Sequence, residues 1–308
     1  MAHSSQSHND TARDELSKRS IPHMTLSSGS PTSLTPPPKP SSHSTPEAAA
    51  TARFAVTGNA ILTGGTGTLA LNACRALLTH GLSGAALLDL NVSSPQTVEQ
   101  LSLLRKDFPS RTIEAIQVDV TDEQAVADAM ARASQLLGSI NHLLCFHGIV
   151  NCAHALETPA STWRRILDVN TTGTFLCAQA AARHMVSQQH GGSITFVASI
   201  SAHRVNFPQP QAAYNVSKAA LVAMKNSLAA EWARYGIRVN SVSPGYMDTI
   251  LNEGEGLSEA RGMWKERNPM GRMGSPSEIE GAVVLLASQA GSYMNGTDIV
   301  VDGGGIVF

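Results

Sequence analysis

A tyrosine and a lysine four residues apart, Tyr214 and Lys218, form the pair with the clearest chemical potential in this chain of 308 residues. The small and apolar residues around them predict a helix, so both side chains are expected on one helical face. An ammonium group beside a phenol lowers the cost of the phenolate, so a tyrosine that titrates near ~10 in isolation could exchange a proton at neutral pH. Proton exchange with a hydroxyl is half of an alcohol oxidation. The other half is a hydride transfer, which needs a nicotinamide cofactor.

Such a pair also occurs by chance on solvated helix faces, so its meaning depends on the elements that position it. From residue 60 the hydrophobic pattern alternates between strands and helices. Strands are expected at 60–63, 85–89, 113–118, 141–146, 192–198, 238–241 and 298–301. Helices are expected at 68–80, 95–107, 122–137, 161–187, around Tyr214, and at 276–288. This alternation predicts an α/β fold, a single doubly wound parallel sheet of the Rossmann type, whose ligands bind beyond the carboxyl ends of the strands.

The first loop at that edge is rich in glycine and joins a strand to the start of a helix. It contains Thr63, Gly64, Gly65, Gly67, Thr68 and Leu69. Backbone N–H groups in this setting can hold a pyrophosphate, so we expect the loop to bind the cofactor. An ordinary glycine turn is the alternative.

Two aspartates end the next strands. Asp89 lies 25 residues after Gly64, where a carboxylate can bind the ribose hydroxyls of NAD(H) and repel the extra phosphate of NADP(H). Asp119, followed by Val120, could meet the adenine amino group. For both aspartates the alternative is a turn residue without a ligand.

Three further positions complete the expected site. Asn170 falls inside a predicted helix, although asparagine is a poor helix former, so it is either a polar core residue or holds a water near the Lys218 ammonium. A serine after strand 192–198 could polarise a substrate oxygen. The segment with Pro244, Gly245 and Thr249 ends a later strand and opens a long excursion, 246–275, that could cover the ligand.

Residues 1–53 have no aromatic residue and are dense in Ser, Thr, Pro and His, so we expect a disordered tail before a folded domain at 54–308. The net charge of −2 gives no basic footprint for nucleic acid, and no apolar run is long enough to span a membrane. Four cysteines without metal-ligand spacing are expected to be buried free thiols, which fits a cytoplasmic protein.

Together these residues resemble the short-chain dehydrogenase/reductase family over about residues 55–308. The motifs are the glycine loop, the two strand-end aspartates, Tyr214 with Lys218, and the closing stretches Asn268–Gly274 and Val301–Gly304. The resemblance implies that Tyr214 is the general acid/base, that Lys218 binds the nicotinamide ribose and lowers the pKa of the tyrosine, and that Asn170 supports a water. The catalytic serine is Ser199 by local pattern, which we prefer, or Ser201 by the usual spacing.

The sequence departs from the family pattern in two places. The second and third glycines of the usual cofactor loop are Thr68 and Ala70. The usual Asn-Asn-Ala-Gly after the fourth strand is Cys145-Phe146-His147-Gly148, in which only Gly148 is kept. We therefore expect Gly148 to contact the cofactor, and the central sheet to be stabilised by other residues.

Within the family, the stretches Pro208–Tyr214 and Ser243–Thr249 resemble NAD-linked fungal polyol dehydrogenases, such as those that convert D-arabinitol to D-ribulose. The implied protein uses NAD(H), acts on a small-molecule alcohol or ketone, and forms a homo-oligomer, either a dimer or a tetramer. Polyol-binding candidates are Asn206, Gln209, Asn252 and Glu253, and for each of them the alternative is an ordinary loop residue. The alternatives are a reductase that tailors a larger ketone in secondary metabolism, and a dinucleotide-binding sensor or scaffold without catalysis.

Overall fold

The computed structural model describes Lys18, residues 20–30, 32–38 and 45–249, Asn252 and residues 254–307. Glu253 and most of the expected tail lie outside the described residues. Residues 20–30 and 32–38 contain no helix or strand. The expectation of an unstructured segment up to residue 53 is wrong for its last eight residues, which form helix α2 (Pro46–Arg53). Thr45 caps this helix by accepting the Ala48 N–H at 3.2 Å, and proline at the first position suits a helix start.

Seven parallel strands form one sheet in the order β3-β2-β1-β4-β5-β6-β7. They are β1 (Asn59–Thr63), β2 (Gly84–Asp89), β3 (Thr112–Gln117), β4 (His142–Cys145), β5 (Gly192–Val197), β6 (Ile237–Pro244) and β7 (Asp298–Val301). The order reverses between β1 and β4, where Thr63 pairs with Cys145. A reversal of this kind opens a crevice at the carboxyl edge of the sheet, so the predicted doubly wound fold is confirmed.

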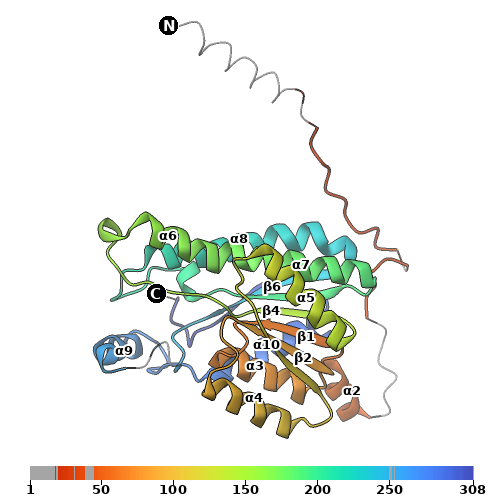
Figure 1. The fold of residues 1–308 in the computed structure, drawn as a ribbon, viewed down its shortest axis with the longest axis horizontal. Helices are drawn as coiled ribbons and strands as arrows, with labels where there is room; N and C mark the ends of the chain where they lie inside the picture. Colours follow the sequence, from red (N-terminus) through yellow and green to blue (C-terminus); the bar gives the residue numbers. More distant parts are fainter. Residues whose placement is uncertain are drawn as a thin grey trace, which may run out of the picture.

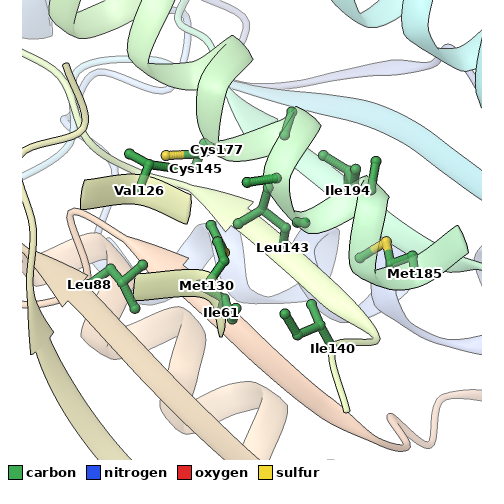
Figure 2. Close-up of a cluster of buried hydrophobic side chains, with 14 of the residues drawn as sticks. Ile61, Leu88, Val126, Met130, Ile140, Leu143, Cys145, Cys177, Met185 and Ile194 are labelled. Atoms are coloured by element: carbon green, nitrogen blue, oxygen red, sulfur yellow. The ribbon is translucent and has the colours of Figure 1, made fainter. Parts of the chain in front are cut away.

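Helices cover both faces of the sheet (Figure 1). One layer is α3 (Thr68–Thr79), α4 (Pro95–Asp107) and α10 (Glu280–Ala287), and the other is α5 (Glu123–Leu137), α7 (Gly173–Gln188) and α8 (Ala212–Trp232). Each layer buries a separate apolar cluster against the sheet. Figure 2 shows the one beneath α5 and α7, where Met130, Leu143 and Met185 are fully buried. Burial of this extent is the main force that fixes the strand register.

The expected helix at 161–187 is interrupted. Helix α6 (Ala160–Leu167) passes into a π-helical segment, Asp168–Thr172, before α7 begins at Gly173. Insertions of this type are rare in helices and are often found at functional sites. Glycine is required at 173 because a Cβ there would lie 2.8 Å from Cγ2 of Val120.

The excursion after β6 contains a helix that the sequence pattern did not predict, α9 (Ser258–Glu266). It stands apart from the two helix layers (Figure 1). Arg261 ties it to the turn after β6 by an ion pair with Asp248 at 2.7 Å. Among the described residues, no helix is long and apolar enough to cross a membrane, and no cluster of three metal-ligating side chains is found.

Candidate active site

Two adjoining cavities lie at the carboxyl edge of the sheet, and they share Phe146, Gly148 and Ile149 in their walls. The larger, of about 880 Å³, is lined by the predicted residues Gly64, Gly67, Asp89, Asp119, Val120 and Gly148. The smaller, of about 240 Å³, is lined by the predicted residues Leu69, Gly148, Ser199, Tyr214, Lys218, Pro244, Gly245 and Thr249. The expected cofactor and catalytic residues are therefore brought together. Thr63, Gly65, Thr68 and Asn170 line neither cavity.

The glycine loop between β1 and α3 packs too closely for side chains at two positions. Gly64 has a φ of +62°, and a Cβ there would lie 2.6 Å from the backbone N of His147. A Cβ on Gly65 would lie 2.6 Å from the carbonyl oxygen of Leu62. Gly67 is the N-cap residue of α3 and has no side chain that could accept a hydrogen bond from the first N–H groups of the helix. This geometry fits a pyrophosphate, which backbone N–H groups at a helix start bind well.

Asp89 stands at the end of β2 and holds the glycine loop. Its Oδ2 accepts hydrogen bonds from the Thr66 backbone N–H at 3.1 Å and from the Thr66 hydroxyl at 2.7 Å. Its Oδ1 accepts the Leu90 N–H at 2.8 Å. Each carboxylate oxygen can accept more than one hydrogen bond, so the group can anchor the loop and still meet a ribose hydroxyl.

Asp119 forms the turn that follows β3. Its Oδ1 accepts the backbone N–H of Thr121 at 2.9 Å and the Thr121 hydroxyl at 2.7 Å. These two hydrogen bonds lower the pKa of the carboxyl group, so it is ionised at neutral pH. Asp119 is thus a turn residue, as the alternative interpretation required. It also lines the larger cavity, where its Oδ2 can accept a hydrogen bond from a ligand.

Tyr214 lies in the first turn of α8 and faces the smaller cavity. Burial raises the pKa of its phenol to about 12, while the hydroxyl of Ser199 acts in the opposite direction and the nearby phenol of Tyr246 raises the pKa further. The expectation of a lowered tyrosine pKa is not met in this structure, because burial of the phenol is the largest influence on it and raises the pKa. The tyrosine is therefore a proton donor at rest.

Ser199 is the serine that approaches the phenol, as the preferred assignment requires. Its hydroxyl donates to Oγ of Ser201 at 3.0 Å and accepts the Ser201 N–H at 3.1 Å. Ser201 is only 5% exposed and receives a weak hydrogen bond from Gln211 at 3.4 Å. Ser201 thus orients Ser199 from behind, although both serines line the cavity.

Lys218 follows Tyr214 by one turn, with its Nζ 5.6 Å from the centre of the tyrosine ring. The Nζ donates a hydrogen bond to the Val197 carbonyl at 2.8 Å. The side chain is 4% exposed, and burial lowers the pKa of the ammonium to about 8. A Cβ on Gly148 would lie 3.4 Å from the Lys218 Nζ, so glycine at 148 keeps the ammonium open to the shared wall of the two cavities.

Asn170 sits at the centre of the π-helical segment and is fully buried. Its side chain pairs with both backbone groups of Ile149: Oδ1 accepts the N–H at 2.8 Å, and Nδ2 donates to the carbonyl at 2.9 Å. Nδ2 also donates to the Ser217 hydroxyl at 2.9 Å, next to Lys218 in the chain. Asn170 is therefore a polar core residue, one of the two alternatives that the sequence allowed. Its hydrogen bonds join the loop after β4 to α8.

An aromatic pair that the sequence pattern did not reveal, Tyr246 and Trp264, lines the smaller cavity. The rings of Tyr246 and Trp264 stack with centroids 4.1 Å apart and planes 6° apart. The Tyr246 oxygen accepts hydrogen bonds from Asn206 at 2.8 Å and from Gln209 at 2.9 Å. Asn252 also lines this cavity, with its Nδ2 donating to the Met247 carbonyl at 2.8 Å. Trp264, the one aromatic residue of α9, is the sequence signal that could have indicated this pair.

Comparison with known proteins gives the same family as the site. The family described as "Enoyl-(Acyl carrier protein) reductase" matches residues 49–305. A D-arabinitol 2-dehydrogenase [ribulose-forming] of Candida albicans (strain WO-1) is 37% identical over 256 residues, which cover 79% of this chain and 91% of that protein. The chain is a short-chain dehydrogenase/reductase.

Solved structures of short-chain dehydrogenases agree with this fold. A short-chain type dehydrogenase/reductase from Mycobacterium marinum is 36% identical, with a TM-score of 0.75 over 82% of this chain and 97% of that chain. A gluconate 5-dehydrogenase from Burkholderia cenocepacia J2315, in complex with NADP and tartrate, is 28% identical, with a TM-score of 0.76 over 84% of this chain and 99% of that chain. The family binds a nicotinamide dinucleotide, and the loop geometry above fits one.

This short-chain dehydrogenase carries His147 after the fourth strand, where the family pattern differs. The ring is 9% exposed and bridges two hydroxyls, with Nδ1 2.5 Å from Thr63 Oγ1 and Nε2 3.1 Å from Thr174 Oγ1. Burial and the charge of Lys218 lower the pKa of the imidazole to about 3, so it stays neutral. The bridge joins the end of β1 to the start of α7.

Three of the four cysteines are buried free thiols, as expected, and Cys152 is exposed. Cys152 lies in the loop after β4 rather than in a strand or helix, so its thiol is not enclosed by the core.

Proposed function

We propose that this short-chain dehydrogenase interconverts a secondary alcohol and a ketone with NAD(H), and that its substrate is a polyol/ketose pair such as D-arabinitol and D-ribulose. The observation that carries this proposal is the meeting of Ser199, Tyr214 and Lys218 in one cavity that adjoins the glycine-loop cleft at Gly148. When bound, the nicotinamide supplies or accepts the hydride at the reacting carbon.

In the reducing direction, Tyr214 donates its phenolic proton to the oxygen of the forming alcohol. Because the pKa of Tyr214 is raised to about 12, the proton is in place before the reaction, and the developing alkoxide is basic enough to take it. For this step the Ser199 hydroxyl turns from Ser201 Oγ, its acceptor in the structure, and donates its hydrogen bond to the same substrate oxygen, which orients that oxygen toward the phenol. In the oxidising direction the same groups act in reverse, and the phenolate takes the hydroxyl proton.

Lys218 supplies the positive charge that a phenolate needs. At neutral pH the ammonium is protonated, since its lowered pKa is still about 8. Its Nζ lies over the Tyr214 ring, 5.6 Å from the ring centre, so the ammonium is placed beside the ring that carries the negative charge of a phenolate. Its remaining N–H groups can reach a ribose hydroxyl at the wall shared with the larger cavity.

The preference for NAD(H) rests on Asp89. Its carboxylate lines the larger cavity at the end of β2, where a second negative charge on the ribose would be repelled. Arg164 and Arg165 line the same cavity from α6 and would favour an additional phosphate. The similar Burkholderia cenocepacia structure holds NADP, so both cofactors belong in the test.

The polyol assignment is supported by the polar side chains around the smaller cavity and by the similar D-arabinitol 2-dehydrogenase. We also propose that the protein acts in the cytoplasm as a dimer or tetramer. Partly exposed aromatic side chains on neighbouring helices, Trp163 on α6 and Phe175 on α7, support this assembly, which sedimentation of the purified chain can measure.

The test is reduction of NAD⁺ and NADP⁺ by the purified protein over pentitols, hexitols and bulky apolar secondary alcohols. Turnover of D-arabinitol with NAD⁺ above NADP⁺ is the expected result. Activity confined to bulky alcohols would replace the polyol substrate by a larger ketone. NADH binding without turnover on any alcohol would contradict an enzymatic role.

A further inference from the structure

The phenol of Tyr246 is held by more hydrogen bonds than the packing of its ring requires. Its ring is held by the Trp264 stack, while its oxygen accepts two hydrogen bonds, from Nδ2 of Asn206 and Nε2 of Gln209. Gln209 also fixes Trp264, because its Oε1 accepts the indole N–H at 3.2 Å. Two amides and one indole are thus used to set the position and rotation of a single phenol.

The hydrogen-bond capacity of this phenol leaves its proton for another group. A phenol oxygen has two lone pairs and one proton, and both lone pairs are engaged by the two amides. Burial raises the pKa of Tyr246, so the proton is retained throughout the physiological range. Among the described residues, no acceptor for this O–H is found, and Tyr246 lines the smaller cavity.

Tyr246 also lies near the catalytic tyrosine. The phenol of Tyr246 contributes to the raised pKa of Tyr214, after the larger effect of burial, so the two side chains lie close enough to interact. Both lie on the wall of a cavity of about 240 Å³ that also contains Ser199. A substrate whose reacting oxygen meets Ser199 and Tyr214 therefore brings its next carbon atoms toward Tyr246.

The amide of Asn206 carries a further sign of a functional arrangement. The residue is 7% exposed, and its Oδ1 is buried without a partner among the described residues. An unpaired buried acceptor destabilises the fold, and such groups in native structures call for a functional explanation. The amide of Asn206 is oriented so that Nδ2 donates to the Tyr246 oxygen, and this orientation leaves Oδ1 without a partner among the described residues.

We propose that Tyr246 is a substrate-binding residue that selects alcohols bearing a second oxygen near the reacting carbon. Its O–H donates a hydrogen bond to that second hydroxyl, while Asn206, Gln209 and Trp264 act as positioning residues. A monohydric alcohol in the same place leaves the O–H unpaired in a partly buried cavity, which costs binding in the transition state. This inference rests on the proposed oxidoreductase function and names the feature of the substrate that the site recognises.

The test is Tyr246→Phe, which keeps the stacked ring and removes only the hydroxyl. We expect kcat/KM for a pentitol to fall about 10- to 100-fold, while that for 2-pentanol changes less than about twofold. If 2-pentanol is too slow a substrate, its inhibition constant against the pentitol gives the same comparison. Tyr293→Phe is the matched control, because Tyr293 is fully exposed and should leave both substrates unaffected.

Gln209→Met tests the positioning role separately. It removes the donor to Tyr246 with little change in size, so the pentitol should lose more kcat/KM than 2-pentanol, with NADH affinity unchanged. An equal loss on both substrates would indicate general damage and would overturn the inference, as would an unchanged preference in Tyr246→Phe. A wild-type protein that oxidises no alcohol would instead overturn the proposed function, and this inference with it.

Discussion

Replacing Lys218 by methionine is expected to abolish turnover and also to change how the stability of the protein depends on pH. The ammonium is buried, with one hydrogen bond to the Val197 carbonyl, and its pKa is lowered from 10.5 to about 8. The fold therefore holds a charge that it solvates poorly. Methionine has a similar length and carries no charge, so it removes the titration and keeps most of the packing.

The sign follows from proton counting. Between pH 8 and pH 10.5 the unfolded lysine is protonated while the folded lysine is not, so the unfolded state binds more protons. The free energy of unfolding of the wild-type protein therefore rises with pH in this window, relative to the variant. The full difference of 10.5 − 8 = 2.5 pH units corresponds to on the order of 3 kcal/mol at ~1.4 kcal/mol per unit. Between pH 7 and pH ~9.5 the free energy of unfolding of the wild-type protein should rise by about 2 kcal/mol relative to that of the variant.

Urea unfolding of both proteins at pH 7 and at pH 9.5 measures this effect. The buried thiol of Cys74, with a pKa raised to about 12, destabilises both proteins as the pH rises, so only the difference between the proteins is informative. The wild-type protein should gain about 2 kcal/mol on the variant. A constant difference, or one that moves in the variant's favour, would refute the view that the fold holds Lys218 as a strained cation.

Two other changes test the cofactor side of the site. Asp89→Ala should raise the ratio of kcat/KM with NADP⁺ to that with NAD⁺ by about 10- to 100-fold, since it removes the repelling charge. Asp89→Asn keeps an acceptor for Thr66 and should give the same trend, and an unchanged ratio in both variants would contradict the role of the charge. His147→Ala should destabilise the protein by about 2–4 kcal/mol and raise KM for the cofactor more than it lowers kcat. A kcat effect as large as that of Tyr214→Phe would instead make His147 a catalytic residue.

The fold follows from the sequence because the apolar pattern and the turn residues agree along most of the folded chain. Gly138 ends α5 in a left-handed conformation with a φ of +81°, as its place after the predicted helix implied. The exceptions are local. The π-helical segment at Asp168–Thr172 depends on the pairing of Asn170 with Ile149, which lies 21 residues earlier in the chain. The hydrophobic periodicity of a helix gives no indication of a hydrogen bond to a residue so far away in the sequence.

The candidate site was predictable where residue type and strand position coincide. Asp89 and Tyr214 belong to this group, because a strand end and a helix face already determine where they point. The pKa of Tyr214 was not predictable, since its direction depends on burial by residues from other elements. The Tyr246–Trp264 stack was missed for a similar reason, because it joins the turn after β6 to α9 through tertiary contacts alone.

Single-turnover reduction by Tyr214→Phe tests the central claim most directly. The variant should bind NADH as the wild-type protein does, which fluorescence titration can show, and should lose at least about 100-fold in the rate of ketone reduction. Tyr235→Phe, a tyrosine outside both cavities, is the control for the same chemical change. Retained turnover in Tyr214→Phe with normal NADH binding would contradict the assignment of Tyr214 as the proton donor.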